Sequence, residues 1–272
     1  MNMLTIDLEE AALSLRAFIQ DTVSGAGFAN VVLGLSGGVD SALAAYLSAQ
    51  ALGPEHVLAL RLPYENSAEE SMSLAQQVIE DTGIRSDTYS ITAGVDGVLD
   101  DFPQADKVRK GNVMARMRMI YLYDQAKALQ GLVVGTGNKT ETLLGYSTLH
   151  GDAAFDLNPL GDLYKTQVWA LAEHLGVPQK IIDRPPTAGL WAGQTDEEEL
   201  GFSYQEADKL LFLLVEKDKT MADCQQVGFE ERFIQEVVER VKRYRFKSTL
   251  PPVGSVGQQP LAILDQRPWF RD

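Results

Sequence analysis

The sequence predicts an α/β fold in which a parallel, twisted sheet is flanked by helices and followed by a helical C-terminal part. Three observations predict it. Through the first half of the 272 residues, short apolar runs typical of buried parallel strands alternate with helical periodicity. Glycine-rich turns follow two of those runs, at 34–38 and at 135–137. Beyond residue 158 the pattern is helical, so we expect the ligand crevice at the carboxyl ends of the earlier strands.

The first expected elements are a helix, a strand and a second helix. Apolar residues from Leu4 to Ile19 recur at three- and four-residue steps, which predicts an amphipathic helix that ends near Gly25 and Gly27. Residues 31–35 are a continuous apolar run and predict a buried strand. Residues 41–52 are rich in Ala and Leu and predict a helix.

The alternation then repeats. Residues 57–62 predict a strand, and Ser67 with Glu70 three positions later forms a capping box at the start of the next helix. The remaining elements are expected in this order: a weaker strand at 87–91, a helix at 109–129, a buried strand at 132–134, and helices at 166–175, 204–216 and 230–244. No repeat or low-complexity linker separates them, which favours a single domain over residues 1–272.

Composition excludes several classes of protein. With 24 Lys and Arg against 38 Asp and Glu, the formal net charge is −14, which disfavours a general nucleic-acid or anionic-membrane binder. One cysteine, Cys224, excludes an internal disulfide framework and a four-thiolate zinc site. The N-terminus lacks a basic segment followed by an apolar core, and no 18 apolar residues run together. We therefore expect a soluble, cytoplasmic protein.

The strongest chemical signal is the loop between the first expected strand and its helix. It comprises Gly34, Leu35, Ser36, Gly37, Gly38, Val39, Asp40 and Ser41. Glycines let the backbone approach an oxyanion, the serine hydroxyls add donors, and the helix start presents free N–H groups. The chain has no Gly-Lys dipeptide, so this is not a Walker A loop. We interpret it as a phosphate cradle; the alternative is a tight turn that is merely rich in Gly and Ser.

This loop resembles the signature of the ATP pyrophosphatase (PP-loop) superfamily, whose members cleave ATP between the α and β phosphates and adenylate a substrate oxygen. Further stretches, in order along the chain, resemble the NAD synthetase family: 135–141 (GTGNKTE), 144–146, 151–152, 158–167 (NPLGDLYKTQ) and 185–191 (PPTAGLW). The resemblance implies a Rossmann-like fold of the adenine nucleotide alpha hydrolase type. It also implies amidation of nicotinate adenine dinucleotide (deamido-NAD) to NAD with ammonia, through an adenylated intermediate, with release of AMP and pyrophosphate.

The resemblance also assigns site residues. It places ATP on residues 34–41, Thr136, Lys165 and Thr187, and Mg²⁺ on Asp40 and Glu141. Lys165, Asp40 and Thr187 are the expected catalytic residues, with Lys165 stabilising the transferring α-phosphate. The dinucleotide is assigned to Arg116, Asp156 and Lys247. Taken singly, Thr136 and Thr187 also fit helix caps, and Glu141 and Lys165 fit solvated helix starts.

Two positions depart from the family pattern. Leu149 stands where many ammonia-dependent members have a dinucleotide-contacting lysine, and Phe246 stands where they have a histidine before Lys247. These departures concern the pose of the dinucleotide and leave the ATP half intact. His150 is interpreted as a structural histidine rather than a replacement for the missing cation.

Weaker features receive ordinary interpretations. Residues 195–199 have capping-box spacing and predict a solvated helix start, although the resemblance makes this neighbourhood a loop over the site. Cys224 is expected to be a structural thiol. Between Lys107 and Arg118 five basic residues and no acidic one occur. Apart from Arg116, this stretch is interpreted mainly as a solvated helix face.

The nitrogen donor and the assembly follow from the resemblance alone. Because the family pattern occupies nearly the whole chain, we expect no glutaminase domain, with free ammonia arriving by diffusion or from a separate glutaminase subunit. The family also implies a homodimer. Two other functions stay open at this stage: another PP-loop adenylating enzyme, for sulfur transfer or tRNA modification, and a nucleotide sensor without turnover.

Overall fold

A computed structural model of the chain describes residues 4–65, 69–191, 193–249 and 251–254. Its centre is a parallel sheet with the strand order β3-β2-β1-β4. The strands are β1 (Asn30–Gly34), β2 (Val57–Arg61), β3 (Arg85–Thr88) and β4 (Gly131–Val134). Strand β1, which precedes the phosphate loop, therefore lies between β2 and β4, so that the loops following β1 and β4 are neighbours at the carboxyl ends of the strands.

Helices cover both faces of the sheet. The helices of the described residues are α1 (Leu8–Gly25), α2 (Val39–Leu52), α3 (Glu69–Thr82), α4 (Thr92–Leu99), α5 (Lys107–Ala128), α6 (Lys139–Leu144), α7 (Lys165–His174), α8 (Gln179–Ile182), α9 (Asp196–Leu200), α10 (Tyr204–Val215), α11 (Met221–Gln226) and α12 (Glu231–Tyr244), with short 3₁₀ turns η1 (Pro54–His56) and η2 (Arg245–Ser248). Side chains of Val31 and Leu33 pack among α1, α2, α3 and α7. Those of Val32 and Val133 pack against α4 and α5 on the other face. This alternation is what a pleated strand requires.

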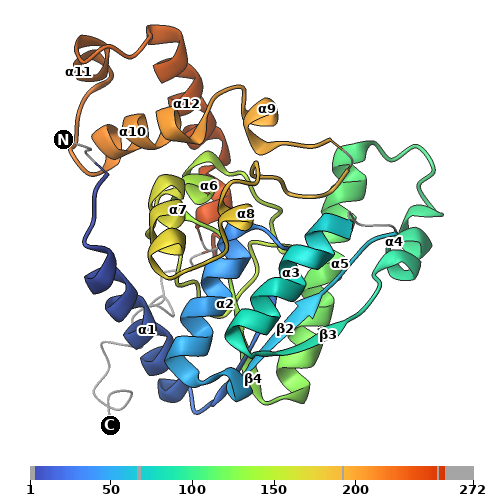
Figure 1. Cartoon of the computed structure of the whole chain (residues 1–272). Helices are drawn as coiled ribbons and strands as arrows, with labels where there is room; N and C mark the ends of the chain where they lie inside the picture. The colour runs from blue at the N-terminus through green and yellow to red at the C-terminus, as the bar shows by residue number, and fades with distance from the viewer. Residues whose placement is uncertain (1–3, 66–68, 192, 250, 255–272) are drawn as a thin grey trace.

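The C-terminal helices form a third apolar cluster. Residues of α10, α11 and α12 pack with Leu144 of α6 and with Tyr164, which precedes α7. In Figure 1 these helices lie together at one end of the molecule, over α6 and α7. The helical C-terminal part thus packs directly on α6 and α7, whose first residues belong to the motifs at 135–141 and 158–167.

The predicted α/β class and element order are confirmed, with some local differences. The weak strand expected at 87–91 lies at Arg85–Thr88 instead. This strand pairs only with β2 and its residues are polar and mostly exposed, so apolar runs could not mark it. Helices α4, α6 and α11 were not predicted. The capping box at Ser67 lies outside the described residues. In the described part of the chain, no helix is long and apolar enough to cross a membrane.

Candidate active site

The candidate site lies at the carboxyl ends of β1 and β4, as the fold class predicts. The loop 34–38 connects β1 to α2, and residues 135–138 connect β4 to α6. Because β1 and β4 are hydrogen-bonded neighbours, these two connections lie beside each other. Asp40 in the first turn of α2 and Glu141 in the first turn of α6 consequently lie close enough to pair with the same lysine, Lys165.

The phosphate loop is held together by its own hydroxyls. The hydroxyl of Ser41 donates to the carbonyl of Gly38 (2.9 Å) and lies 3.1 Å from that of Ser36, whose oxygen accepts from the N–H of Gly38 (3.2 Å). The Ser41 oxygen also accepts from the N–H of Ser36 (3.2 Å). In this structure these hydroxyls bond within the loop, and their role as ligand donors stays a prediction. The backbone N–H groups at the start of α2 are further donors that a phosphate could use.

Gly37 is the position in this loop that requires glycine. Its φ is +80°, and a Cβ there would lie 2.4 Å from the carbonyl oxygen of Ser71 in α3. Arg184 ties the same two segments, because its guanidinium donates to the hydroxyl of Ser71 (2.8 Å) and lies 3.5 Å from the carbonyl of Gly37. The sequence analysis missed Arg184. The loop is therefore backed by α3 and by the segment after α8.

The centre of the crevice is a buried lysine between two carboxylates. Nζ of Lys165 lies 2.5 Å from Oδ2 of Asp40 and 3.2 Å from Oε1 of Glu141. The lysine side chain is 2% exposed, and the two carboxylates are 18% and 17% exposed. Lys165 begins α7, Asp40 lies in α2 and Glu141 in α6. The fold thus brings together three predicted site residues that are far apart in the sequence.

Asn138 orients both carboxylates, and the sequence analysis did not single it out. Its side-chain amide donates to Oδ1 of Asp40 (2.9 Å). Its oxygen accepts from the N–H of Glu141 (3.0 Å), while its own N–H donates to Oε2 of Glu141 (3.2 Å). The last two bonds form a capping box at the start of α6. The Asn-x-x-Glu spacing in 138–141 was the signal that could have identified it.

Burial and charge shift the pKa values of this cluster. Burial raises the pKa of Glu141 to about 8, with Asp40 adding to the rise and Lys165 opposing it. Burial would lower the pKa of Lys165, but Asp40 and Glu141 outweigh it and hold that pKa above its usual range. The lysine is therefore a permanent cation at a site with two carboxyl groups.

The donor set fits a hard cation that also binds phosphate. Mg²⁺ is commonly held by one or two carboxylates, with phosphate and water oxygens completing its octahedron. Asp40 and Glu141 would supply such a pair beside the phosphate loop, and Glu141, whose pKa is raised by burial, would release its proton on binding the cation. In the described part of the chain no three His, Cys, Asp or Glu side chains gather as an all-protein metal site would need. Any Mg²⁺ here would therefore depend on phosphate oxygens for its remaining ligands.

Residues 184–191 connect α3 with α5 through contacts at their two ends. Arg184 contacts Ser71 of α3 at one end. At the other, Lys107 of α5 lies over the ring of Trp191 at 4.7 Å. Thr187 accepts a hydrogen bond from the N–H of Gly189 and lines a cavity of about 640 Å³ between this segment, α3 and α8. Within the described residues, neither Thr187 nor Thr136 bonds to the lysine cluster, so their assignment to ATP stays a prediction.

Residues 195–199 differ from the prediction of a solvated helix start. Thr195 does cap α9, accepting from the N–H of Glu198. Asp196, however, is 4% exposed, and its two oxygens lie 3.0 Å from the hydroxyls of Tyr146 and Tyr204. The ring of Tyr204 also lies 5.2 Å from Nζ of Lys165. The helix start is thus confirmed, but the burial of Asp196 was not predicted, because its partners come from α10 and from the turn after α6, which local spacing does not reveal.

Two of the three residues assigned to the dinucleotide, Arg116 and Lys247, lie beside the turn that follows α6. Arg116 donates to the carbonyl of Leu149 (3.2 Å). Nζ of Lys247 donates to the carbonyls of Gly145 (2.8 Å) and Ser147 (2.6 Å), and burial lowers its pKa. Asp156 lies elsewhere, accepting from the N–H of Val133 and the hydroxyl of Tyr123. The structure therefore brings Arg116 and Lys247 to one turn, whereas Asp156 lies beside β4, where it accepts from the N–H of Val133.

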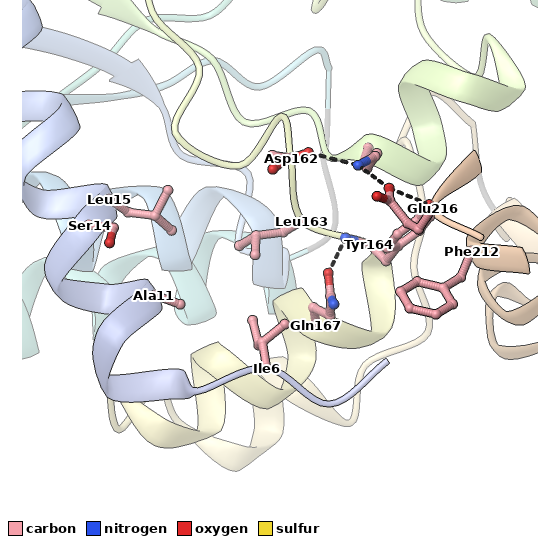
Figure 2. Close-up of a pocket in the computed structure, with 11 residues that line it drawn as sticks. Ile6, Ala11, Ser14, Leu15, Asp162, Leu163, Tyr164, Gln167, Phe212 and Glu216 are labelled. Atoms are coloured by element: carbon pink, nitrogen blue, oxygen red, sulfur yellow. Dashed lines mark hydrogen bonds and ion pairs between the residues drawn. The ribbon is translucent and has the colours of Figure 1, made fainter. Parts of the chain in front are cut away.

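Other features have structural explanations. Cys224 is buried in α11, and burial raises the pKa of its thiol, as expected of a structural cysteine. A separate cavity of about 350 Å³ lies between α1, α10 and the start of α7. Figure 2 shows apolar side chains such as Leu15 and Leu163 in its wall. At its edge Lys139 pairs with Asp162 (2.7 Å) and Glu216 (2.6 Å).

Comparisons with known proteins show which family the chain resembles. A family model described as NAD synthase matches residues 12–251. The chain is 48% identical over 256 residues to an NH(3)-dependent NAD(+) synthetase from Trichlorobacter lovleyi, covering 94% of each protein. Among solved structures it resembles NMN synthetase from Francisella tularensis (TM-score 0.82, 35% identity, 92% of this chain and 99% of that one). It also resembles NH3-dependent NAD synthetase from Campylobacter jejuni (TM-score 0.80, 31% identity, 92% of this chain and 100% of that one).

Proposed function

The chain belongs to the NAD synthase family, and on that premise we propose how its crevice carries out the family's reaction. The enzyme is an ammonia-dependent carbon–nitrogen ligase. It converts nicotinate adenine dinucleotide to NAD at the expense of ATP, through an adenylated carboxylate, and releases AMP and pyrophosphate. The family match over most of the chain favours this reaction over sulfur transfer, tRNA modification or nucleotide sensing. The observation that carries the mechanism is Lys165, held between Asp40 and Glu141 beside the phosphate loop.

The phosphate loop and the two carboxylates bind the triphosphate of ATP. Backbone N–H groups at the start of α2 contact phosphate oxygens, and the helix dipole favours their negative charge. Asp40 and Glu141 would hold Mg²⁺ against the same oxygens. A bound Mg²⁺ would neutralise part of the charge on the departing pyrophosphate. Thr136 and Thr187, from the two connections beside the loop, complete this ATP site.

Lys165 stabilises the α-phosphate while the dinucleotide carboxylate attacks it. The attack concentrates negative charge in a crevice that already contains two carboxyl groups, so an additional fixed cation lowers the barrier. The four-carbon stem of Lys165 can carry its ammonium from Asp40 to a phosphate oxygen without moving α7. Asp40 and Glu141 keep the ammonium charged and in place until the phosphate arrives.

Arg116, Asp156 and Lys247 bind the dinucleotide. Arg116 and Lys247 already fix carbonyls of the turn at 145–149, which supports a substrate lying against that turn. Ammonia then attacks the activated acyl carbon, and AMP leaves. Leu149 contributes its carbonyl to Arg116 where other members have a lysine side chain, so the phosphates of the dinucleotide rely here on Arg116 and Lys247.

We also propose the setting of the reaction. Residues 1–272 act as one catalytic unit, because α10 and α12 pack directly on α7 and α6. The active form is a homodimer, for which family membership is the support. The cytoplasm is the proposed compartment, and one buried, unpaired cysteine fits a reducing environment. Ammonia arrives by diffusion or from a separate glutaminase; glutamine alone should then give no NAD with the pure chain.

The adenylation half-reaction provides the test. Exchange of labelled pyrophosphate into ATP should require Mg²⁺ and nicotinate adenine dinucleotide but no ammonium. Lys165→Met should reduce this exchange by at least about 100-fold, as expected for losing a group that stabilises transition-state charge. Lys139→Met is the matched control, because Lys139 also bridges two carboxylates but lies outside the crevice. It should retain the exchange.

Two results would overturn the proposal. Exchange that proceeds without the dinucleotide would show that its carboxylate is not the group adenylated. Equal exchange rates in the Lys165→Met and Lys139→Met variants would remove the role assigned to Lys165.

A further inference from the structure

Lys165, the first residue of α7, is held in place through its backbone by hydrogen bonds that lead to a buried carboxylate, Asp208, in the C-terminal helical part. Asp208, in α10, has no exposed surface. One of its oxygens accepts from the hydroxyl of Thr140 (2.6 Å), and the other accepts from the N–H of Thr166 (2.8 Å). The Thr140 oxygen in turn accepts from the N–H of Lys165 (2.9 Å). The first two N–H groups of α7 are thus both satisfied by this network.

These bonds join the two helix starts that carry the catalytic cluster. Thr140 directly precedes Glu141 in α6, and Lys165 is the first residue of α7. Both are buried, with Thr140 showing no exposed surface. The negative charge of Asp208 lies at the positive end of the α7 dipole, where a carboxylate is favourable. Movement of Asp208 would therefore displace Glu141 and Lys165 relative to each other.

Two side chains of α10 act on Lys165, one on its ammonium group and the other on its backbone. Tyr204 lies four residues before Asp208, which places the two side chains on one face of the helix. The Tyr204 ring lies 5.2 Å from the ammonium of Lys165, whereas Asp208 acts on its backbone through Thr140. A helix that supplies no ligand to ATP in our account therefore determines where the catalytic lysine lies.

We propose that Asp208, acting through the Thr140 hydroxyl, is a positioning residue for Lys165 in the amidation reaction. The inference rests on the proposed role of Lys165. A misplacement of about 1 Å at a reacting group can cost a rate factor of about 100. Among the described residues, neither Asp208 nor Thr140 bonds directly to the phosphate loop, which the network reaches through Lys165 and Asp40, so we expect the positioning to affect kcat more than the binding of ATP.

The test compares conservative variants at Thr140. Thr140→Val removes the hydroxyl at nearly constant shape and should lower kcat for NAD formation about 10- to 100-fold, with the KM for ATP changed less than about threefold. Thr140→Ser keeps the hydroxyl and should restore kcat to within about threefold of the unmodified enzyme. Thr142→Val is the matched control on α6, because the Thr142 hydroxyl donates only to the carbonyl of Asn138. It should leave kcat unchanged.

Asp208→Asn gives a second route if the Thr140→Val variant fails to fold. Thr140 and Thr166 donate to different oxygens of Asp208, and in asparagine one of these atoms becomes an NH2 group that cannot accept, so one of the two bonds is lost in the present geometry. It should lower kcat about tenfold or more, again with little change in the KM for ATP.

A double-mutant cycle separates positioning from general stabilisation. If Thr140 acts through Lys165, Thr140→Val should cause no further loss on the residual rate of the Lys165→Met variant. Independent, multiplicative losses would overturn the proposal, as would a Thr140→Ser variant as slow as Thr140→Val. A lowered melting temperature with unchanged kcat would also overturn it. Failure of the proposed function itself would look different, because the unmodified chain would then form no NAD.

Discussion

Replacing Gly37 by alanine should lower the free energy of unfolding by more than the cost of placing an L-residue in the left-handed conformation. Gly37 and Gly27 share nearly the same backbone conformation, with φ values of +80° and +78°. For an L-residue this conformation costs about 1–2 kcal/mol. At Gly27 nothing lies within 4 Å of the added Cβ, so Gly27→Ala should cost only that amount.

At Gly37 a steric term is added. The Cβ would lie 2.4 Å from the Ser71 carbonyl oxygen, which belongs to the backbone of α3 and cannot rotate away. Overpacking of this kind typically adds about 1–3 kcal/mol. Gly37→Ala should therefore lower the free energy of unfolding by about 2–5 kcal/mol, and the displaced loop should weaken ATP binding by about tenfold or more.

Urea unfolding and the KM for ATP measure the two effects. Gly27→Ala controls for the backbone conformation and should leave the KM for ATP unchanged. Equal losses of stability in the two variants would refute the steric argument. A Gly37→Ala variant with the normal KM for ATP would show that the loop does not bind the nucleotide.

Four further predictions concern the rest of the site. Asp40→Ala should reduce pyrophosphate–ATP exchange by about 100-fold or more while leaving dinucleotide affinity nearly unchanged; equal exchange would remove Asp40 from the ATP site. The folded chain holds the Glu141 proton up to about pH 8, whereas an ordinary carboxyl releases it near pH 4.5, so the free energy of unfolding should decrease as the pH rises across this interval. Urea titrations should show a smaller decrease for Glu141→Gln, and identical pH profiles would contradict the assignment. In steady-state kinetics, Arg116→Ala should raise the KM for the dinucleotide about 10- to 100-fold and change the KM for ATP little. An equal rise in the two KM values would argue against separate sites for the two substrates. Cys224→Ala should keep full activity and cost about 1 kcal/mol of stability; an inactive, folded variant in the amidation assay would revive a role for the thiol.

Buried strands and local spacing made much of the fold predictable. The apolar runs at 31–35, 57–62 and 132–134 identified β1, β2 and β4 because residues covered on both faces are continuously hydrophobic. The edge strand β3 was misplaced by a few residues, since its polar residues are exposed and carry no such pattern. Short helices such as α6 and α11 escaped notice because six residues scarcely complete a helical period.

The candidate site was predictable where motifs mark it and hidden where tertiary contacts build it. Asp40, Glu141 and Lys165 were identified through family motifs, and the fold brings them together at contact distances. Asp196 and Asp208 were not identified, because each becomes significant only through partners 8 to 68 residues away in the sequence. Spacing along one helix cannot predict such pairings.

The stoichiometry of products tests the central claim most directly. The full chain would be incubated with Mg-ATP, ammonium and nicotinate adenine dinucleotide, and NAD, AMP and ADP would be quantified together, with nicotinate mononucleotide as a second acceptor in a parallel reaction. We expect equal amounts of NAD and AMP, dependent on all three substrates, and no ADP. AMP without NAD would show that the adenylyl group is transferred to another acceptor. Binding of ATP without its conversion to AMP would contradict catalysis.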